Sequence, residues 1–211
     1  FQRRNRTYYD DLSRLHGQLV APGLRVLEIG CGLGDRLSSL QPALGIGVEP
    51  DPQLAEAAQA RHPQLRIVNV RPEALTPAAL GAQQPFDVIL LTNSLNTLGD
   101  VQATLERLAP LCHARTRLVI SFHNWLWQPL LKAAESLGQR RPQPPESWLT
   151  PGDVSNLLDL AGWEVLKRGH RCLLPRQIPL LTPLANRWLS QLPIVELLGL
   201  THWMVARPSA L

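Results

Sequence analysis

Two carboxylates and three glycines carry the most specific chemical information in this chain. Glu28 lies near the end of an apolar run, and Glu49 ends a second apolar run before Pro50. The glycines follow the first run directly and are Gly30, Gly32 and Gly34. A short apolar run is typical of a buried parallel strand, and glycines after it form a turn through which backbone approaches a ligand closely. The chemistry predicted here is binding of a polar small molecule at a strand end.

The glycine spacing argues against one common ligand of such turns. A dinucleotide fingerprint reads G-x-G-x-x-G and requires its third glycine at position 35, which is Asp35, whereas the glycine stands at position 34. An NAD-dependent dehydrogenase is therefore disfavoured.

The pattern that does fit is E-x-G-x-G-x-G, and with it the chain resembles the class I S-adenosylmethionine (SAM) methyltransferases. This resemblance implies that the glycine loop passes under the methionine part of SAM and that Glu28 helps to hold its ammonium group. The acceptor for the ribose hydroxyls is expected about 20 residues further on, at the end of the second strand, where Glu49 stands. The cofactor expected is SAM, with S-adenosylhomocysteine (SAH) as product.

The resemblance also implies a fold and a set of site residues. The fold is α/β, a Rossmann-like, seven-stranded, mostly parallel sheet in the order 3-2-1-4-5-7-6 with the last strand antiparallel, helices on both faces and a cap built from insertions. The residues expected at the cofactor are Tyr8, Glu28, Gly30, Cys31, Gly32, Gly34, Glu49, Pro50, Glu73, Asn93, Ser94 and Leu95. The residues expected at the acceptor are Tyr9, Asn124, Trp125 and Trp148.

Several of these assignments have alternatives. Arg71 occupies the position where the family usually has the acid that contacts adenine, so Glu73 is the nearest candidate and a backbone contact is the other. Tyr8 and Tyr9 either close over the sulfonium or pack the N-terminal helix on the sheet. Cys31 is either a reactive thiol or, as is commoner, a small residue that fits between two glycines.

His123 is the candidate general base, because it follows the fifth strand at the edge where open α/β sheets bind ligands and its side chain titrates near neutrality. The alternative is a hydrogen-bonded structural residue beside the tryptophans. The cysteines and histidines show no ligand spacing, so no metal site is expected.

The hydrophobic pattern predicts a single domain over residues 1–211. An N-terminal helix is expected within 1–23, and cap insertions at 122–151 and 171–200. Strands are expected at 26–29, 45–49, 65–70, 86–91, 117–122, 163–166 and 202–207. Helices are expected at 35–40, 52–61, 100–108 and 150–161, with short pieces such as 184–192 inside the second insertion.

Composition limits the location and the partners. Residues 1–113 carry 10 basic and 11 acidic residues, and residues 114–211 carry 11 and 6. No apolar run reaches the ~20 residues that cross a bilayer, and no signal peptide is visible. A cytoplasmic protein is predicted, with a peripheral membrane contact through the basic, leucine-rich insertion as an option.

Asn124-Trp-Leu-Trp127 and Gln177-Ile-Pro-Leu-Leu181 resemble a methyltransferase subgroup that is fused or adjacent to glycosyltransferases. That resemblance implies a small-molecule, glycan or glycolipid acceptor, with a hydroxyl oxygen as the methylated atom. The alternative is a catalytically silent SAM-fold module that partners a glycosyltransferase. Nucleic-acid methylation ranks third, because Asn93-Ser-Leu-Asn96 is not an Asn-Pro-Pro-Tyr motif.

Overall fold

The computed structural model describes residues 6–81, 85–124, 126, 128, 149–171 and 201–209. The strands are β1 (Arg25–Ile29), β2 (Leu44–Val48), β3 (Arg66–Val68), β4 (Phe86–Thr92), β5 (Cys112–His123), β6 (Trp163–Arg171) and β7 (Thr201–Pro208). The α-helices are α1 (Arg6–Leu19), α2 (Asp35–Ser39), α3 (Pro52–Arg61), α4 (Pro77–Leu80), α5 (Val101–Leu108) and α7 (Pro151–Leu160). Short 3-10 turns are η2 (Pro72–Ala74), η3 (Leu95–Thr97) and η4 (Ala109–Leu111).

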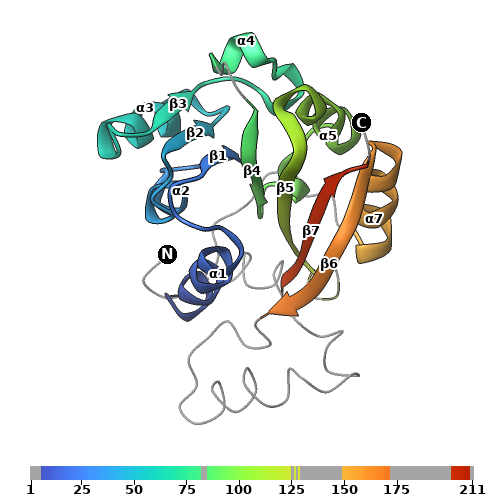
Figure 1. The fold of residues 1–211 in the computed structure, drawn as a ribbon. Coiled ribbons are helices and arrows are strands. Elements are labelled where there is room, and N and C mark those ends of the chain that lie inside the picture. Colours follow the sequence, from blue (N-terminus) through green and yellow to red (C-terminus); the bar gives the residue numbers. More distant parts are fainter. Residues whose placement is uncertain are drawn as a thin grey trace.

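The strands form one seven-stranded sheet in the order β3-β2-β1-β4-β5-β7-β6 (Figure 1). Neighbours from β3 to β5 are parallel, and β7 lies antiparallel between β5 and β6. The expected fold class, strand order and antiparallel last strand are thus confirmed. In a sheet of this kind the carboxyl ends of β1, β2 and β4 meet at one edge, where ligands bind.

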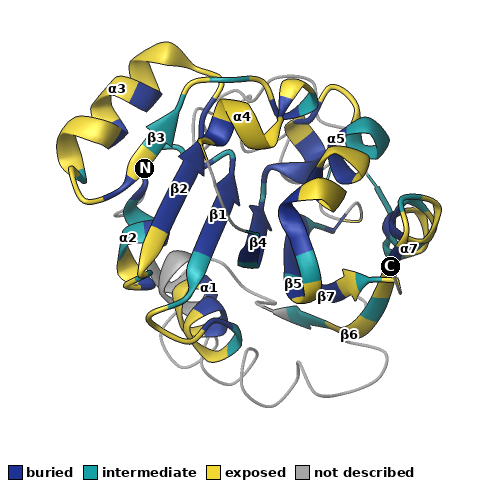
Figure 2. Cartoon of the chain, turned by 45° about the horizontal axis from the view of Figure 1, so that its top comes forward, coloured by how far each residue is buried: buried dark blue, intermediate teal, exposed yellow. Residues whose placement is uncertain are grey.

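Alternating residues of each strand build two separate cores. Leu27, Ile89 and Ile120 point to the face that Leu80 of α4, Leu105 of α5 and the apolar side of α7 cover. Val26, Val88 and Val119 point to the opposite face, which Leu37 of α2 and the end of α1 cover. We call this second face the α1 face. Figure 2 shows β1 and β4 almost wholly buried between these layers, while β6 at the sheet margin is largely exposed.

Local chemistry explains where several helices begin. Asp51 accepts hydrogen bonds from Gln53 N (2.8 Å) and Leu54 N (3.2 Å) at the start of α3, and Pro52 occupies the first turn. At α7, Thr150 and Asp153 form a reciprocal capping box. Both helix starts were expected from the sequence.

Most of the expected insertions, 122–151 and 171–200, lies outside the described residues, as does the piece at 184–192. Among the described residues, the helices are too short or too polar for any of them to span a bilayer.

Candidate functional site

The loop after β1 adopts the backbone that its glycines predict. Gly30, Gly32 and Gly34 have φ angles of 70°, 55° and 76°, in the left-handed region that side chains disfavour. The N–H groups of Gly30 and Cys31 both donate to the carbonyl oxygen of Val48, at 2.8 and 3.0 Å. The loop is therefore tied to the end of β2. A Cβ atom added to Gly30 would lie 2.8 Å from Ser94 Cβ, so the loop also abuts the segment after β4.

Glu49 braces this loop from the end of β2. Its Oε2 accepts a hydrogen bond from Gly32 N at 2.8 Å, and its Oε1 accepts one from Asp51 N at 3.1 Å. Asn69 holds the backbone of the same corner by donating from Nδ2 to the carbonyl oxygens of Glu49 (2.8 Å) and Pro50 (3.0 Å). The Glu49 side chain is buried, and Pro50 is exposed beside it. The carboxylate is thus fixed within contact distance of the glycine loop.

Glu28 is fully buried one strand away and forms an ion pair that the sequence analysis did not anticipate. Its Oε1 accepts a hydrogen bond from Arg36 Nη1 at 2.7 Å. Burial raises the pKa of Glu28, and the nearby Arg36 guanidinium opposes that rise. Because Ile29 pairs with Val48, the two carboxylates lie at the ends of neighbouring strands, on either side of the loop. The expected convergence of Glu28, Glu49 and the glycines is observed.

The structure favours the packing role for Cys31. A Cβ added to Gly47 of β2 would lie 2.6 Å from Cys31 Sγ, so the thiol fills the space over that glycine. Burial, reinforced by the carboxylates of Glu28 and Glu49, raises the pKa of the thiol to about 12. A thiol with such a pKa is protonated at neutral pH and is a poor nucleophile.

The segment after β4 turns sharply at Asn93, which has a left-handed φ of 54° and donates its backbone N–H to Ser121 O at 2.8 Å. Ser94 then lies against Gly30, while Leu95 is buried in the hydrophobic core on the α5 side of the sheet. Ser94 thus lies at the glycine loop, directly after Asn93, and the expected contact of these residues with the cofactor stays a prediction. The Leu95 side chain instead anchors the segment.

The remaining expected residues divide into three groups. His123 ends β5 opposite Thr201, and Asn124 is buried with its Oδ1 accepting from Leu126 N at 3.1 Å. Glu73 Oε1 accepts from Gly99 N (3.0 Å) and Asp100 N (3.3 Å), so this oxygen is committed to the start of α5. Tyr8 and Tyr9 lie on α1, with side chains outside the described part of the structure, and Trp125 and Trp148 lie outside it entirely.

Sequence reasoning missed Arg36 and a histidine from the N-terminal helix. His16 is fully buried, its Nε2 lies 3.4 Å from Thr92 Oγ1 at the end of β4, and burial, with Arg36 adding to the effect, lowers its pKa to about 3. Neither residue belongs to a spaced motif. The only signal was the location of a polar residue within the apolar stripe of a helix, Leu12, Leu15 and Leu19.

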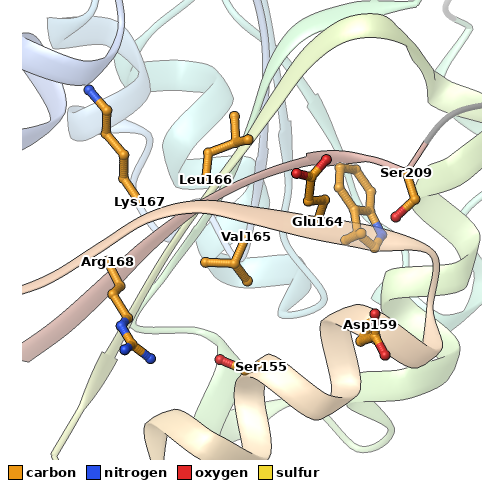
Figure 3. Close-up of a pocket in the computed structure, with 9 residues that line it drawn as sticks. Ser155, Asp159, Glu164, Val165, Leu166, Lys167, Arg168 and Ser209 are labelled. Carbon is orange, nitrogen blue, oxygen red and sulfur yellow. The ribbon is translucent and has the colours of Figure 1, made fainter.

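A hollow of about 630 Å³ lies away from this edge, between α7 and the marginal strand β6. In Figure 3, Val165 and Arg168 point from β6 toward α7, whereas Leu166 and Lys167 point to the other side. The pairing register of β6 shifts between Val165 and Lys167, which explains why two consecutive side chains share a face. This hollow contains none of the glycine-loop residues. Within the described ranges no cluster of His, Cys, Asp and Glu side chains has the arrangement of a metal site.

Comparison with known proteins agrees with this geometry. A family described as "Methyltransferase domain" matches residues 1–168. A curated relative, the ubiquinone biosynthesis O-methyltransferase of Bradyrhizobium diazoefficiens, is 28% identical over 177 residues, covering 79% of this chain. The chain spans 65% of that relative's length.

Solved structures share the fold. A SAM-dependent methyltransferase of Thermotoga maritima, described as a possible histamine N-methyltransferase, superimposes with a TM-score of 0.69 at 19% identity, covering 98% of this chain and 91% of that one. Magnesium protoporphyrin IX methyltransferase of Synechocystis PCC 6803, solved with bound SAH, gives a TM-score of 0.61 at 18% identity and covers 97% and 83%.

Proposed function

This chain belongs to the methyltransferase domain family, as a class I SAM-dependent enzyme, and from that premise we propose that it methylates a hydroxyl oxygen of a small molecule. The choice of oxygen rests on the curated relatives, which are named as ubiquinone biosynthesis O-methyltransferases. A hydroxyl on an aromatic ring is the favoured acceptor, because its pKa of about 10, as in tyrosine, makes the proton easier to remove than that of an alcohol.

The proposal rests mainly on the hydrogen bonds that Glu49 accepts at the glycine loop. Its two carboxylate oxygens each accept one backbone N–H. A carboxylate offers about four acceptor positions, so two are left for the neighbouring hydroxyls of a ribose. The fit of the residues to SAM is therefore good at this end of the site.

The part of the site where the methionine group of SAM is expected differs from the sequence prediction, in which Glu28 alone held the ammonium group. Glu28 is paired with Arg36, so its negative charge is already partly neutralised where the ammonium group was expected to bind. Arg36 carries five N–H donors and uses one of its nitrogens on Glu28. We propose that Glu28 orients Arg36 so that its guanidinium group faces the carboxylate of SAM. Glu28 then attracts the ammonium group of SAM electrostatically from a position behind the Arg36 side chain.

SAM supplies a methyl group on a sulfonium sulfur, and the S–CH3 bond breaks as the O–CH3 bond forms. The protein must hold the acceptor oxygen about 3 to 3.5 Å from the methyl carbon and take up the hydroxyl proton. His123 is the proposed base. Support comes from its position at the carboxyl end of β5, next to β4, whose following segment abuts the glycine loop.

A sugar or glycolipid hydroxyl is the second acceptor class, with a glycosyltransferase as the proposed partner. One support is the resemblance of Asn124-Trp-Leu-Trp127 and Gln177-Ile-Pro-Leu-Leu181 to the subgroup fused or adjacent to glycosyltransferases. The other is that residues 114–211 carry 11 basic and 6 acidic residues, a balance that suits anionic precursors. Transfer of labelled methyl from SAM to phenolic acids or to sugar phosphates separates the two classes. Binding of SAM without transfer to any acceptor would favour the silent-module alternative.

The proposal is tested by calorimetry of SAM and SAH binding to the wild-type chain and to Glu49→Gln. Loss of one charge-assisted contact is expected to weaken SAM by about ten- to a hundredfold. Glu164→Gln is the matched control, because Glu164 is exposed on β6 and pairs with Arg207 at 2.7 Å, away from the loop. Equal SAM affinity in all three proteins would remove Glu49 from the site.

A further inference from the structure

The short helix α2 is tied at its first residue to the end of α3. Asp35 Oδ1 lies 2.9 Å from Nε2 of His62, which follows α3, and 2.7 Å from Nε of Arg61, the last residue of α3. The His62 side chain is only 16% exposed, whereas that of Arg61 is 56% exposed. Because solvent screens an exposed ion pair, the contact with His62 is the stronger of the two.

His62 is itself fixed, and it also touches the glycine loop. Its backbone N–H donates to Ala58 O at 2.9 Å, and its carbonyl oxygen accepts from Leu65 N at 2.9 Å. A Cβ atom added to Gly34 would lie 3.2 Å from His62 Cδ2, so the imidazole packs against the third glycine of the loop. The same ring therefore contacts the last glycine of the loop and the first residue of α2. It fixes the direction in which the helix leaves the loop.

The first turn of α2 depends on such contacts for its position. The helix has five residues, too few to be stable alone, and Gly34 before it gives no side-chain cap. Leu37 anchors its apolar side in the core. On the polar side, Asp35 reaches α3, and Arg36 Nη1 donates to Glu28 Oε1 of β1 at 2.7 Å. A shift of this turn would therefore move the Arg36 guanidinium directly.

The Glu49 end of the proposed cofactor site has separate supports. The Glu49 carboxylate accepts from Gly32 N and Asp51 N, and Asn69 holds the adjoining backbone. None of these hydrogen bonds involves Asp35 or His62. Loss of the Asp35–His62 contact should therefore leave the ribose end of the site in place.

We propose that Asp35 and His62 are positioning residues that direct the Arg36 guanidinium toward the carboxylate of SAM. The inference rests on the proposed cofactor site and deepens it, because it assigns the two ends of that site to separate supports. The amino-acid end depends on the Asp35–His62 contact, whereas the ribose end depends on Glu49. Ligands with and without the amino-acid group should therefore respond differently to substitutions at Asp35 or His62.

The test compares SAH with 5′-methylthioadenosine, which keeps the adenosine and the sulfur but has neither the carboxylate nor the ammonium group. SAH binding is measured by calorimetry, and 5′-methylthioadenosine binding by displacement of SAH. His62→Ala and Asp35→Ala are each expected to weaken SAH binding by about three- to tenfold and to leave 5′-methylthioadenosine binding within about twofold of wild type. His62→Gln should restore SAH binding, because a glutamine amide can donate to the Asp35 carboxylate as the imidazole does.

Gln64→Ala is the matched control, since Gln64 Nε2 donates to Ser38 Oγ at 2.9 Å and so ties the far end of α2 to the residues after α3. It should change neither affinity. The inference is overturned if the alanine variants of Asp35 and His62 weaken both ligands equally or weaken neither. It is also overturned if glutamine at position 62 fails to restore SAH binding, or if Gln64→Ala acts as His62→Ala does. A wild-type chain that binds neither ligand would instead refute the proposed cofactor site, and the inference with it.

Discussion

The buried histidine of α1 makes the stability of this protein depend on pH. His16 is fully buried, and burial, aided by Arg36, lowers its pKa from 6.5 to about 3. In the unfolded chain the imidazole takes up a proton below pH 6.5, whereas in the folded chain it stays neutral down to about pH 3. The stability it contributes is therefore present above pH 6.5 and is lost progressively as the pH falls from 6.5 toward 3.

The size of this effect follows from the two pKa values. A pH of 5 lies about 1.5 units below the pKa of the imidazole in the unfolded chain, so protonation stabilises the unfolded state. The free energy of unfolding is therefore about 2 kcal/mol lower at pH 5 than at pH 7. For a chain of this length that corresponds to roughly 4–8 °C in the thermal midpoint. His16→Gln removes the titrating group and should flatten this part of the profile.

Urea unfolding of the wild type and of His16→Gln at pH 5, 6 and 7 measures the difference. His202 is the internal comparison, because burial, with His170 adding to it, lowers its pKa to about 4, and it should contribute a similar slope in both proteins. If the pH dependence of the two proteins is the same within about 0.5 kcal/mol, the imidazole is protonated or solvated in the native state and the reasoning fails.

Three further substitutions probe the site. Gly30→Ala should cost about 1–2 kcal/mol in unfolding free energy for the left-handed φ of 70°, and more for the 2.8 Å approach to Ser94, with SAM affinity lost. Arg36→Met should destabilise by about 3–5 kcal/mol, because it strands the buried carboxylate of Glu28, and adding Glu28→Gln should recover part of that loss in urea unfolding. His123→Gln should lower the rate of methyl transfer by about a hundredfold with SAM affinity unchanged.

Each of these has a separate control or refuting result. Gly152→Ala is the control for the glycine substitution, because its nearest neighbour, Thr150 Oγ1, is 3.6 Å away and alanine is favourable in a helix. A loss below about 1 kcal/mol in Arg36→Met would mean that Glu28 is not held as a charge. Full turnover of His123→Gln across pH 6–9 would assign the histidine a structural role.

The resemblance to class I methyltransferases predicted the strand order, and the chain's local patterns predicted most element starts, but not the full length of two strands. The apolar run at 117–122 is only the second half of β5, which begins at Cys112. The first half is polar and is held by Thr116, whose Oγ1 donates to Phe86 O at 2.7 Å and accepts from His113 N at 2.8 Å. β6 likewise continues through Lys167 to Arg171 because β7 pairs with it. Such pairing depends on partners that a local run does not reveal.

The candidate site, too, was predictable from the sequence only in part. Glu28 is the last but one residue of β1, the glycines follow that strand, and Glu49 follows β2. All of them fall within one continuous stretch, where apolar runs mark the strands and glycines or carboxylates mark their ends. The partner of Glu28 depends on how α2 leaves the loop, and no residue type signals that direction. His16 and Thr92 are 76 positions apart and meet only because α1 packs across the end of β4.

The order in which the strands are made differs from the order in which they pair. β6 is completed at Arg171, yet in the sheet it bonds to β7, which begins at Thr201. A nascent chain that has emerged only as far as β6 therefore leaves both the outer side of β5 and the whole of β6 without their partner. Such unpaired edges are where growing polypeptides associate wrongly. Synthesis of β7 therefore determines when the edges of β5 and β6 are paired and can no longer associate with other chains.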